Sequence, residues 1–149
     1  MCDHCGCRAF PPIAELTADH ETILDLAWAL AEAPRSEDRP DRDVRRDLLA
    51  LLDRHVAKEE TGLYPALVAT GAVSAGEVRD LEADHRDLRR SLTDGGFDRR
   101  DFYALAAHIE DEEMELFPAA MLGFDDEEWG ATSDAHRAVD AATAAAAVT

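Results

Sequence analysis

Basic side chains are scarce in this sequence: 15 lysines and arginines stand against 33 aspartates and glutamates, which leaves a formal net charge of −18. Nucleic acids and anionic membrane surfaces are bound through basic patches, so the charge balance argues against both as partners. Long apolar runs are also missing, because no stretch approaches the roughly 20 residues that span a bilayer. The sequence therefore predicts a protein that binds neither nucleic acid nor membrane.

Cysteine is scarce too, with three residues at positions 2, 5 and 7. An odd number of closely spaced cysteines is unlike the disulfide framework of a secreted domain. The first residues also lack the basic flank and apolar stretch of a signal peptide, so we expect a cytoplasmic location. Cys2, His4, Cys5 and Cys7 leave two alternatives open: a small metal or thiol-redox site, or a mobile tail with reduced thiols.

The alternation with period two that is typical of half-buried strands is missing, and four segments instead place apolar residues three or four positions apart. The predicted helices cover residues 12–33, 42–70, the stretch from an N-cap at Ser74 to the turn at 94–96, and 98–121. Short connections make consecutive helices antiparallel neighbours. The pattern therefore predicts an all-α protein, an up-down-up-down four-helix bundle.

The chain divides into three predicted parts: a cysteine-rich tail over residues 1–11, the bundle over 12–124, and a C-terminal helix with an alanine-rich tail over 125–149. We expect this extra helix to pack across the bundle through Trp129, or else to fray. Its one histidine, His136, is expected at the surface.

The bundle contains an internal repeat. Residues 55–66 match residues 108–119, with histidine, two glutamates, leucine, an aromatic residue, proline and alanine at the same offsets. Residues 16–20 match residues 81–85, and both share a Leu-x-Ala-Asp-His pattern. Each helix of the first hairpin thus has a counterpart in the second, which indicates a bundle with pseudo-two-fold symmetry.

The repeat places polar ligand-type residues on apolar helix faces. Positions i and i+4 lie on one face of a helix, so each His-x-x-x-Glu pair can point at one spot. Imidazole and carboxylate groups in a core are costly unless they are paired or bind a metal, and this ligand set suits borderline metal ions. The predicted ligands are His20, His55, Glu59, His85, His108 and Glu112.

Two further features accompany these ligands. The Tyr64-Pro65 and Phe117-Pro118 pairs predict helix kinks with packing aromatic rings, because proline removes an intrahelical hydrogen bond. Asp19 and Asp84 precede ligand histidines, and either they are solvated or they hydrogen-bond an imidazole from a neighbouring helix.

The order of a lone histidine, a His-x-x-x-Glu pair, a lone histidine and a second His-x-x-x-Glu pair resembles the hemerythrin-like family, in particular its HHE cation-binding branch. The resemblance spans residues 12–124 and implies a four-helix bundle that holds a non-haem di-iron centre. It implies two iron ions joined by an oxo or hydroxo bridge. The first two histidines would ligate one iron, the last two the other, and the two glutamates would bridge them.

The sequence departs from oxygen-carrying hemerythrins at two points. Those proteins have a second histidine on the third helix, four residues from the first, whereas Leu81 and Arg89 flank His85 here. Their last bridging carboxylate is an aspartate five residues after its histidine, whereas Glu112 follows after four. One iron must therefore take water, substrate or another carboxylate, and the nearest further carboxylates are Glu60 and Glu82.

Three functions fit this interpretation. The leading hypothesis is a protein that binds O2, or a related small ligand such as NO or peroxide, at the di-iron centre. The second is an enzyme that decomposes peroxide or handles NO, since the missing histidine opens a coordination position. The third is an iron or redox sensor, in which loss of the metal unfolds the bundle and a partner detects the change, and the cysteine tail favours this hypothesis. A redox partner could supply electrons in each case, and the sequence leaves open whether the protein is an enzyme.

Overall fold

The computed structural model describes residues 9–32, 40–94 and 96–147, and the regular structure in these ranges is entirely helical. The α-helices are α1 (Pro11–Glu32), α2 (Pro40–Lys58), α3 (Tyr64–Ala69), α4 (Ala75–Thr93), α5 (Arg99–Asp111), α6 (Phe117–Gly123) and α7 (Asp126–Ala147). Two π-helical turns, η2 (Glu59–Leu63) and η3 (Glu112–Leu116), join α2 to α3 and α5 to α6. The predicted all-α fold is confirmed.

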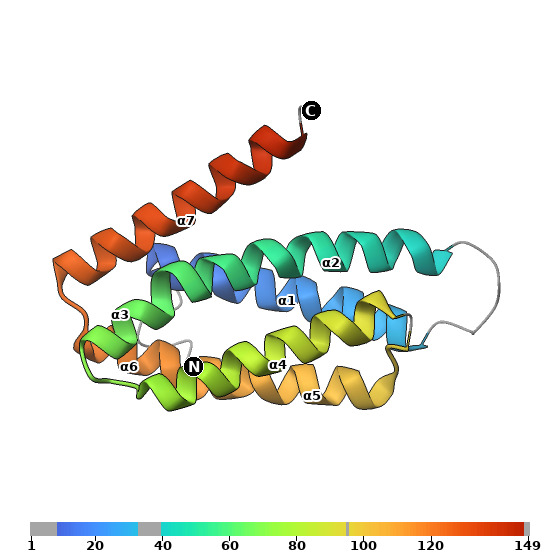
Figure 1. The fold of residues 1–149 in the computed structure, drawn as a ribbon, viewed down its shortest axis with the longest axis horizontal. Helices are drawn as coiled ribbons and strands as arrows, with labels where there is room; N and C mark the ends of the chain where they lie inside the picture. Colours follow the sequence, from blue (N-terminus) through green and yellow to red (C-terminus); the bar gives the residue numbers. More distant parts are fainter. Residues whose placement is uncertain (1–8, 33–39, 95, 148–149) are drawn as a thin grey trace.

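Four rods lie side by side in the bundle: α1, α2 continued by α3, α4, and α5 continued by α6 (Figure 1). α1 packs against α2 and α5, and α4 packs against the same two helices. α7 is the additional C-terminal helix, and it crosses obliquely over α1, α2 and η2 (Figure 1). No helix among the described residues has both the length and the apolar character needed to cross a bilayer.

Local sequence sets where the second hairpin begins. Ser74 caps α4 as predicted: its hydroxyl accepts from the Glu77 amide, and the Glu77 carboxylate accepts from the Ser74 amide. Asp98 and Asp101 form the same reciprocal box at the start of α5. The turn before Ser74 needs Gly71, whose φ of 72° lies in the left-handed region.

The apolar core consists of two clusters, one toward each end of the bundle. The first includes Ile13, Leu16, Leu63, Tyr64, Leu67 and Phe117. The second includes Ile23, Ala27, Leu48, Leu52, Leu105 and Ile109. Each of the larger side chains among them stabilises the folded state by about 1.5–3 kcal/mol when it is fully buried. Along each helix, the predicted ligand histidines come between residues of the first cluster and residues of the second. A polar layer therefore separates two apolar layers of the core.

The predicted kinks at the two prolines take the form of π-turns. The amides of Tyr64 and Phe117 bond to carbonyls five residues back, those of Glu59 and Glu112. Pro65 and Pro118 follow directly; each lacks an N–H and crowds the preceding turn, which favours a wider turn there.

The π-turn changes which side chains face the core. In an uninterrupted α-helix, a residue nine positions after His55 would lie roughly half a turn away from it. The extra residue in the π-turn instead brings Tyr64 to the same side, where it is fully buried. Phe117 reaches the equivalent place in the second repeat. Each π-turn therefore inserts an aromatic ring beside a predicted ligand.

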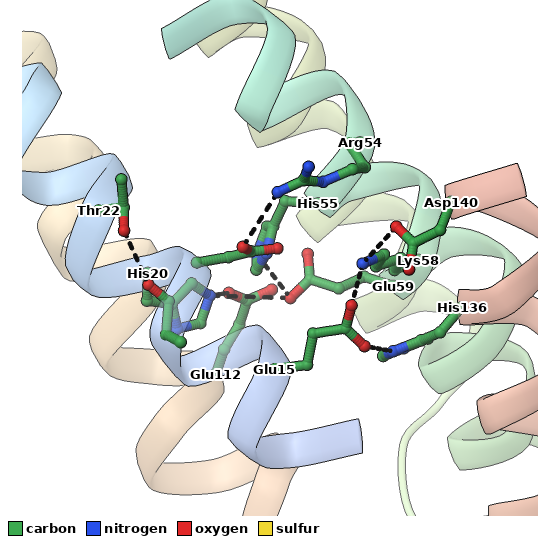
Figure 2. A network of polar contacts seen from close by, with 12 residues as sticks. Glu15, His20, Thr22, Arg54, His55, Lys58, Glu59, Glu112, His136 and Asp140 are labelled. Atoms are coloured by element: carbon green, nitrogen blue, oxygen red, sulfur yellow. Dashed lines mark hydrogen bonds and ion pairs between the residues drawn. The ribbon is translucent and has the colours of Figure 1, made fainter. Parts of the chain in front are cut away.

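α7 docks through a polar network that the sequence analysis did not predict. His136 was expected at the surface and that expectation is wrong: the side chain is buried, with Nδ1 2.8 Å from Glu15 Oε2. Lys58 donates to Glu15 and lies 2.9 Å from Asp140 of α7 (Figure 2). His136 lies four positions after the buried Thr132, so both face the bundle.

Two further contacts seat α7. Trp129 packs as predicted, with its ring centroid 4.4 Å from that of Phe10 and 4.8 Å from that of Phe124. Gly62 of η2 lets α7 approach closely, because a Cβ at this position would lie 3.1 Å from the Ala135 Cβ. The C-terminal helix thus covers the π-turn that begins at Glu59.

Candidate metal centre

Each rod of the bundle brings one histidine to its middle: His20 on α1, His55 on α2, His85 on α4 and His108 on α5. The two π-turns begin with the remaining predicted ligands, Glu59 and Glu112, which have essentially no solvent exposure. The structure therefore brings together all six residues that the repeat singled out. The His55–Glu59 and His108–Glu112 contacts join residues i and i+4, the spacing from which the ligand pairs were predicted.

The histidines form two pairs across the bundle. The ring centroids of His20 and His55 are 4.6 Å apart, and those of His85 and His108 are 4.7 Å apart. These are the pairs that the family resemblance implies. Figure 2 shows the first pair, with Glu59 and Glu112 beside it.

Each carboxylate faces both histidine pairs. Glu59 Oε1 lies 3.1 Å from Nε2 of His55, and its Oε2 lies 3.5 Å from Nε2 of His85. Glu112 Oε2 lies 3.3 Å from Nε2 of His20, and its Oε1 lies 3.4 Å from Nε2 of His108. All four Nε2 atoms thus converge on two carboxylates, with one oxygen of each carboxylate toward each pair.

The outward-facing Nδ1 atoms also meet carboxylates. Asp19 Oδ2 lies 3.6 Å from His55 Nδ1, and Asp84 Oδ2 lies 3.6 Å from His108 Nδ1. In both cases the aspartate and the histidine belong to neighbouring helices, as one of the two sequence interpretations required. At 3.6 Å, however, the contact is longer than a hydrogen bond.

Two glutamates supply the shorter Nδ1 contacts. Glu60 Oε1 lies 3.0 Å from His85 Nδ1, and Glu113 Oε1 lies 3.1 Å from His20 Nδ1. Glu60 was considered as a further iron ligand, but in this structure it faces the outer nitrogen of a histidine. The sequence analysis did not single out Glu113, although the repeat aligns it with Glu60 and so carried the signal.

Other sequence candidates lie elsewhere. Glu82 pairs with Arg86 at 3.9 Å and does not join the converging groups. Cys2, His4, Cys5 and Cys7 fall outside the described residues, so the alternatives for the tail stay open.

The two aromatic residues after the π-turns line the centre differently. Tyr64 stacks on His85 at a ring-centroid distance of 6.0 Å, and Phe117 stacks on His20 at 5.6 Å. The Tyr64 hydroxyl also donates a hydrogen bond to Glu112 Oε1, which Phe117 cannot do for Glu59. Burial and the Glu59 and Glu112 carboxylates raise the pKa of Tyr64, so its phenol remains a donor. The sequence analysis predicted packing at Tyr64 but not this hydrogen bond.

The centre holds buried polar atoms that the protein does not satisfy. His20 Nε2, both carboxylate oxygens of Glu59 and Glu112 Oε2 have no hydrogen-bond partner of acceptable geometry. The Nε2 atoms of His85 and His108 lie 2.9 Å apart, so one of these two nitrogens must be unprotonated and accept from the other. Orphaned buried groups of this kind are costly, and a bound cation would satisfy them together.

The ligand atoms also have the spacing of a metal site. Those of His20, His55, Glu59 and Glu112 lie within 4.8 Å of one another, and so do those of His85, His108 and Glu112. The donor set of imidazole and carboxylate suits borderline cations. The buried cluster therefore fits a metal site.

The electrostatics of the centre favour positive charge. Burial disfavours the imidazolium, yet the Glu59 carboxylate and its neighbours outweigh burial and raise the pKa of His55 to about 10. Against the same burial effect, Glu112 raises the pKa of His108 to about 9. Burial opposes ionisation of Glu112, but interaction with the neighbouring His108 and His20 imidazoles, 3.4 Å and 3.3 Å from its oxygens, holds the pKa of Glu112 well below the usual value. In metal-free protein at neutral pH, protons on these imidazoles would take the place of cations.

Comparison with known proteins agrees with the geometry. A family model described as the hemerythrin HHE cation binding domain matches residues 11–94. This range covers more than half of the 149 residues, and the chain belongs to that family. Membership of this family implies that the chain binds a cation. A search of curated proteins found no match, and neither did a search of solved structures.

The matched range includes His20, His55, Glu59 and His85 but stops before His108 and Glu112. The assignment of the last two residues to the site therefore depends on the internal repeat and on the distances given above. The family match and the geometry are thus complementary: one identifies the class of domain, and the other adds the second His-x-x-x-Glu pair.

Replacing Tyr64 tests whether its hydroxyl stabilises the centre. Tyr64→Phe copies the residue at the equivalent position of the other repeat, so the ring is kept and only the bond to Glu112 is lost. We expect the free energy of unfolding of the metal-free protein to fall by about 1–3 kcal/mol, because a buried charged acceptor loses its donor. Urea unfolding measures this. The control Tyr103→Phe alters a hydroxyl that is 61% exposed and should change stability by less than about 0.5 kcal/mol. Equal effects of the two substitutions would contradict the role of the bond.

The raised histidine pKa values predict how metal-free stability depends on pH. An unfolded histidine titrates near pH 6.5, so the stabilisation from His55 and His108 is complete below that pH and is lost as pH rises through about 9 to 10. We expect the free energy of unfolding to fall by more than about 1.4 kcal/mol, the value of one pKa unit, between pH 6.5 and 10.

Urea unfolding of chelator-treated protein across this range measures the decline. Glu59→Gln removes the carboxylate that acts most strongly on His55 and should flatten the curve. Glu115→Gln changes an exposed carboxylate of η3 and should leave the slope unchanged. A flat or rising profile in the wild-type protein would show that the histidines do not retain these protons.

Proposed function

We propose that this chain is a non-haem di-iron protein that binds O2, or a related small ligand such as NO or peroxide, in the core of its bundle. The observation that carries the proposal is the placement of Glu59 and Glu112, each with one oxygen toward each histidine pair. Two carboxylates that face two imidazole pairs are suited to two cations rather than one.

The residues divide naturally between two ions. His20 and His55 would hold one ion, and His85 and His108 the other. Glu112 belongs to both groups of ligand atoms, and Glu59 would be shared through the oxygen that lies 3.5 Å from His85 Nε2. Iron is the cation we propose, because the family resemblance implies it and imidazole with carboxylate suits it. Two ferrous ions would supply the two electrons that reversible O2 binding requires.

The protein's own groups support that function in three ways. The apolar clusters on both sides of the polar layer shield it along the length of the bundle. The outer carboxylates orient the imidazoles, with Glu60 and Glu113 at hydrogen-bond distance from Nδ1. The Tyr64 hydroxyl holds Glu112 in place. Together these groups keep the six ligands preorganised.

One observation favours a second candidate function, an enzyme that consumes peroxide or NO. The position four residues after His85 is Arg89, and its guanidinium extends to the surface, where it lies 2.7 Å from Asp53. No described residue replaces the histidine that oxygen carriers have there, so the His85 and His108 half has fewer protein ligands. Fewer protein ligands leave coordination positions at which a small molecule can react.

Iron stoichiometry tests the proposal. Metal-free protein is loaded with Fe(II) without oxygen, passed through a desalting column, and analysed for iron per chain. We expect two ions in the wild type and about one in Glu59→Gln, because the amide keeps one oxygen donor but loses the second oxygen and the negative charge, so residue 59 can no longer bind both ions. Glu115→Gln, on the exposed side of η3, should retain two. A wild-type protein without stoichiometric iron would overturn the proposal.

The same samples separate the two candidate functions. Iron-loaded protein is exposed to oxygen, its optical spectrum is recorded, and the oxygen is then removed under vacuum. Return of the original spectrum supports carriage. Irreversible change, together with peroxide consumption above that of free iron and lost in Glu59→Gln, supports the enzyme.

A further inference from the structure

A groove between α4 and α5 reaches the centre from the surface. Its volume is about 380 Å³, and its lining includes His85 and His108 together with Asp84, Asp87, Asp101 and Asp111. The lining residues include no lysine or arginine, although Arg90 pairs with Asp87 from outside at 2.7 Å. A cleft of this composition concentrates cations and repels anions.

His108 gives the groove a direct connection to the ligands. Its side chain is only 9% exposed, and its Nδ1 atom has no hydrogen-bond partner. The nearest carboxylate oxygen to that nitrogen is on Asp84, 3.6 Å away in the groove lining. A buried, unpartnered imidazole nitrogen therefore faces an acidic groove that is open to solvent.

A second groove, between α1 and α5, is the competing route. It has a volume of about 290 Å³, and Glu21, Glu110 and Glu113 contribute to its lining beside His20. His20 is only 1% exposed, and Glu113 occupies its outer nitrogen at 3.1 Å. This groove thus meets one ligand, whose outer nitrogen already contacts Glu113. The α4 and α5 groove meets two ligands, and the outer nitrogen of one of them, His108, has no hydrogen-bond partner.

We propose that the groove between α4 and α5 is the path by which divalent cations reach the centre. A hydrated Fe(II) ion would exchange part of its water shell for the aspartate carboxylates and then pass to His85 and His108. This inference rests on the metal centre of the proposed function. It assigns to the four aspartates that line the groove a role in the rate of metal uptake, whereas the six ligands determine the final stoichiometry.

Blocking each groove with a matched substitution tests the path. Ala107 lines the α4 and α5 groove, and Ala106 lines the α1 and α5 groove. Co(II) added to metal-free protein serves as the probe, and stopped-flow absorbance follows its uptake. We expect Ala107→Phe to slow uptake about tenfold at unchanged final stoichiometry, and Ala106→Phe to leave the rate near that of the wild type.

A charge substitution tests the same path without filling space. Asp87→Asn with Asp111→Asn removes two carboxylates from the groove and should slow Co(II) uptake about threefold or more at low ionic strength. Glu21→Gln with Glu110→Gln removes two from the other groove and should have little effect. Added salt should slow the wild type more than the first double variant, because screening weakens the attraction that the variant has already lost.

The outcomes separate failure of the path from failure of the centre. Wild-type protein that takes up no stoichiometric Co(II) or Fe(II) would contradict the centre itself. Full uptake at equal rates in all variants would overturn only the path, and a slow rate in Ala106→Phe alone would assign the path to the other groove. Unfolding curves check that each variant folds. If Ala107→Phe does not fold, the uptake rates of the two double variants, Asp87→Asn with Asp111→Asn and Glu21→Gln with Glu110→Gln, test the path.

Discussion

The burial of four imidazoles and two carboxylates in one layer of the bundle is the constraint on which the rest of the structure depends. Groups of this kind are costly in an apolar core unless partners or cations satisfy them. Here the partners are incomplete: both oxygens of Glu59 and Nε2 of His20 have none. The apolar clusters above and below hold this layer in place, so packing energy supports an arrangement that is unfavourable without a metal.

Much of the centre could be predicted because the sequence repeats. A lone His20 on an apolar helix face has several explanations. Its match to His85 and the match between the two His-x-x-x-Glu pairs favour one of them, a metal site to which both repeats contribute ligands. The i, i+4 rule then placed Glu59 beside His55 without any tertiary information. The pairing of helices followed from short connections, and the structure agrees.

Other features could not be predicted from sequence patterns. The π-turns depend on how the backbone before Pro65 and Pro118 adjusts to the missing N–H. A proline in a helical sequence predicts a kink but does not indicate the type of turn. Tyr64 reaches Glu112 only because of the extra residue in η2. The burial of His136 depends on Glu15, which is distant in sequence and supplies its partner. Such tertiary pairings leave no periodic signal.

The two repeats are similar but not equivalent, and two of the differences concern the His85 and His108 half. Tyr64, which stacks on His85, has a hydroxyl where Phe117, which stacks on His20, has none. The wider groove also opens on this half. The pseudo-symmetric framework therefore supports a centre with one side more accessible than the other. Both small-ligand binding and metal uptake require such an accessible side.

Anomalous X-ray diffraction at the iron edge, from crystals of protein loaded with Fe(II) without oxygen, tests the central claim most directly. We predict two anomalous peaks per chain, one beside His20 and His55 and one beside His85 and His108, with Glu59 and Glu112 contacting both. A single peak, or peaks remote from these residues, would contradict the account of a paired metal centre.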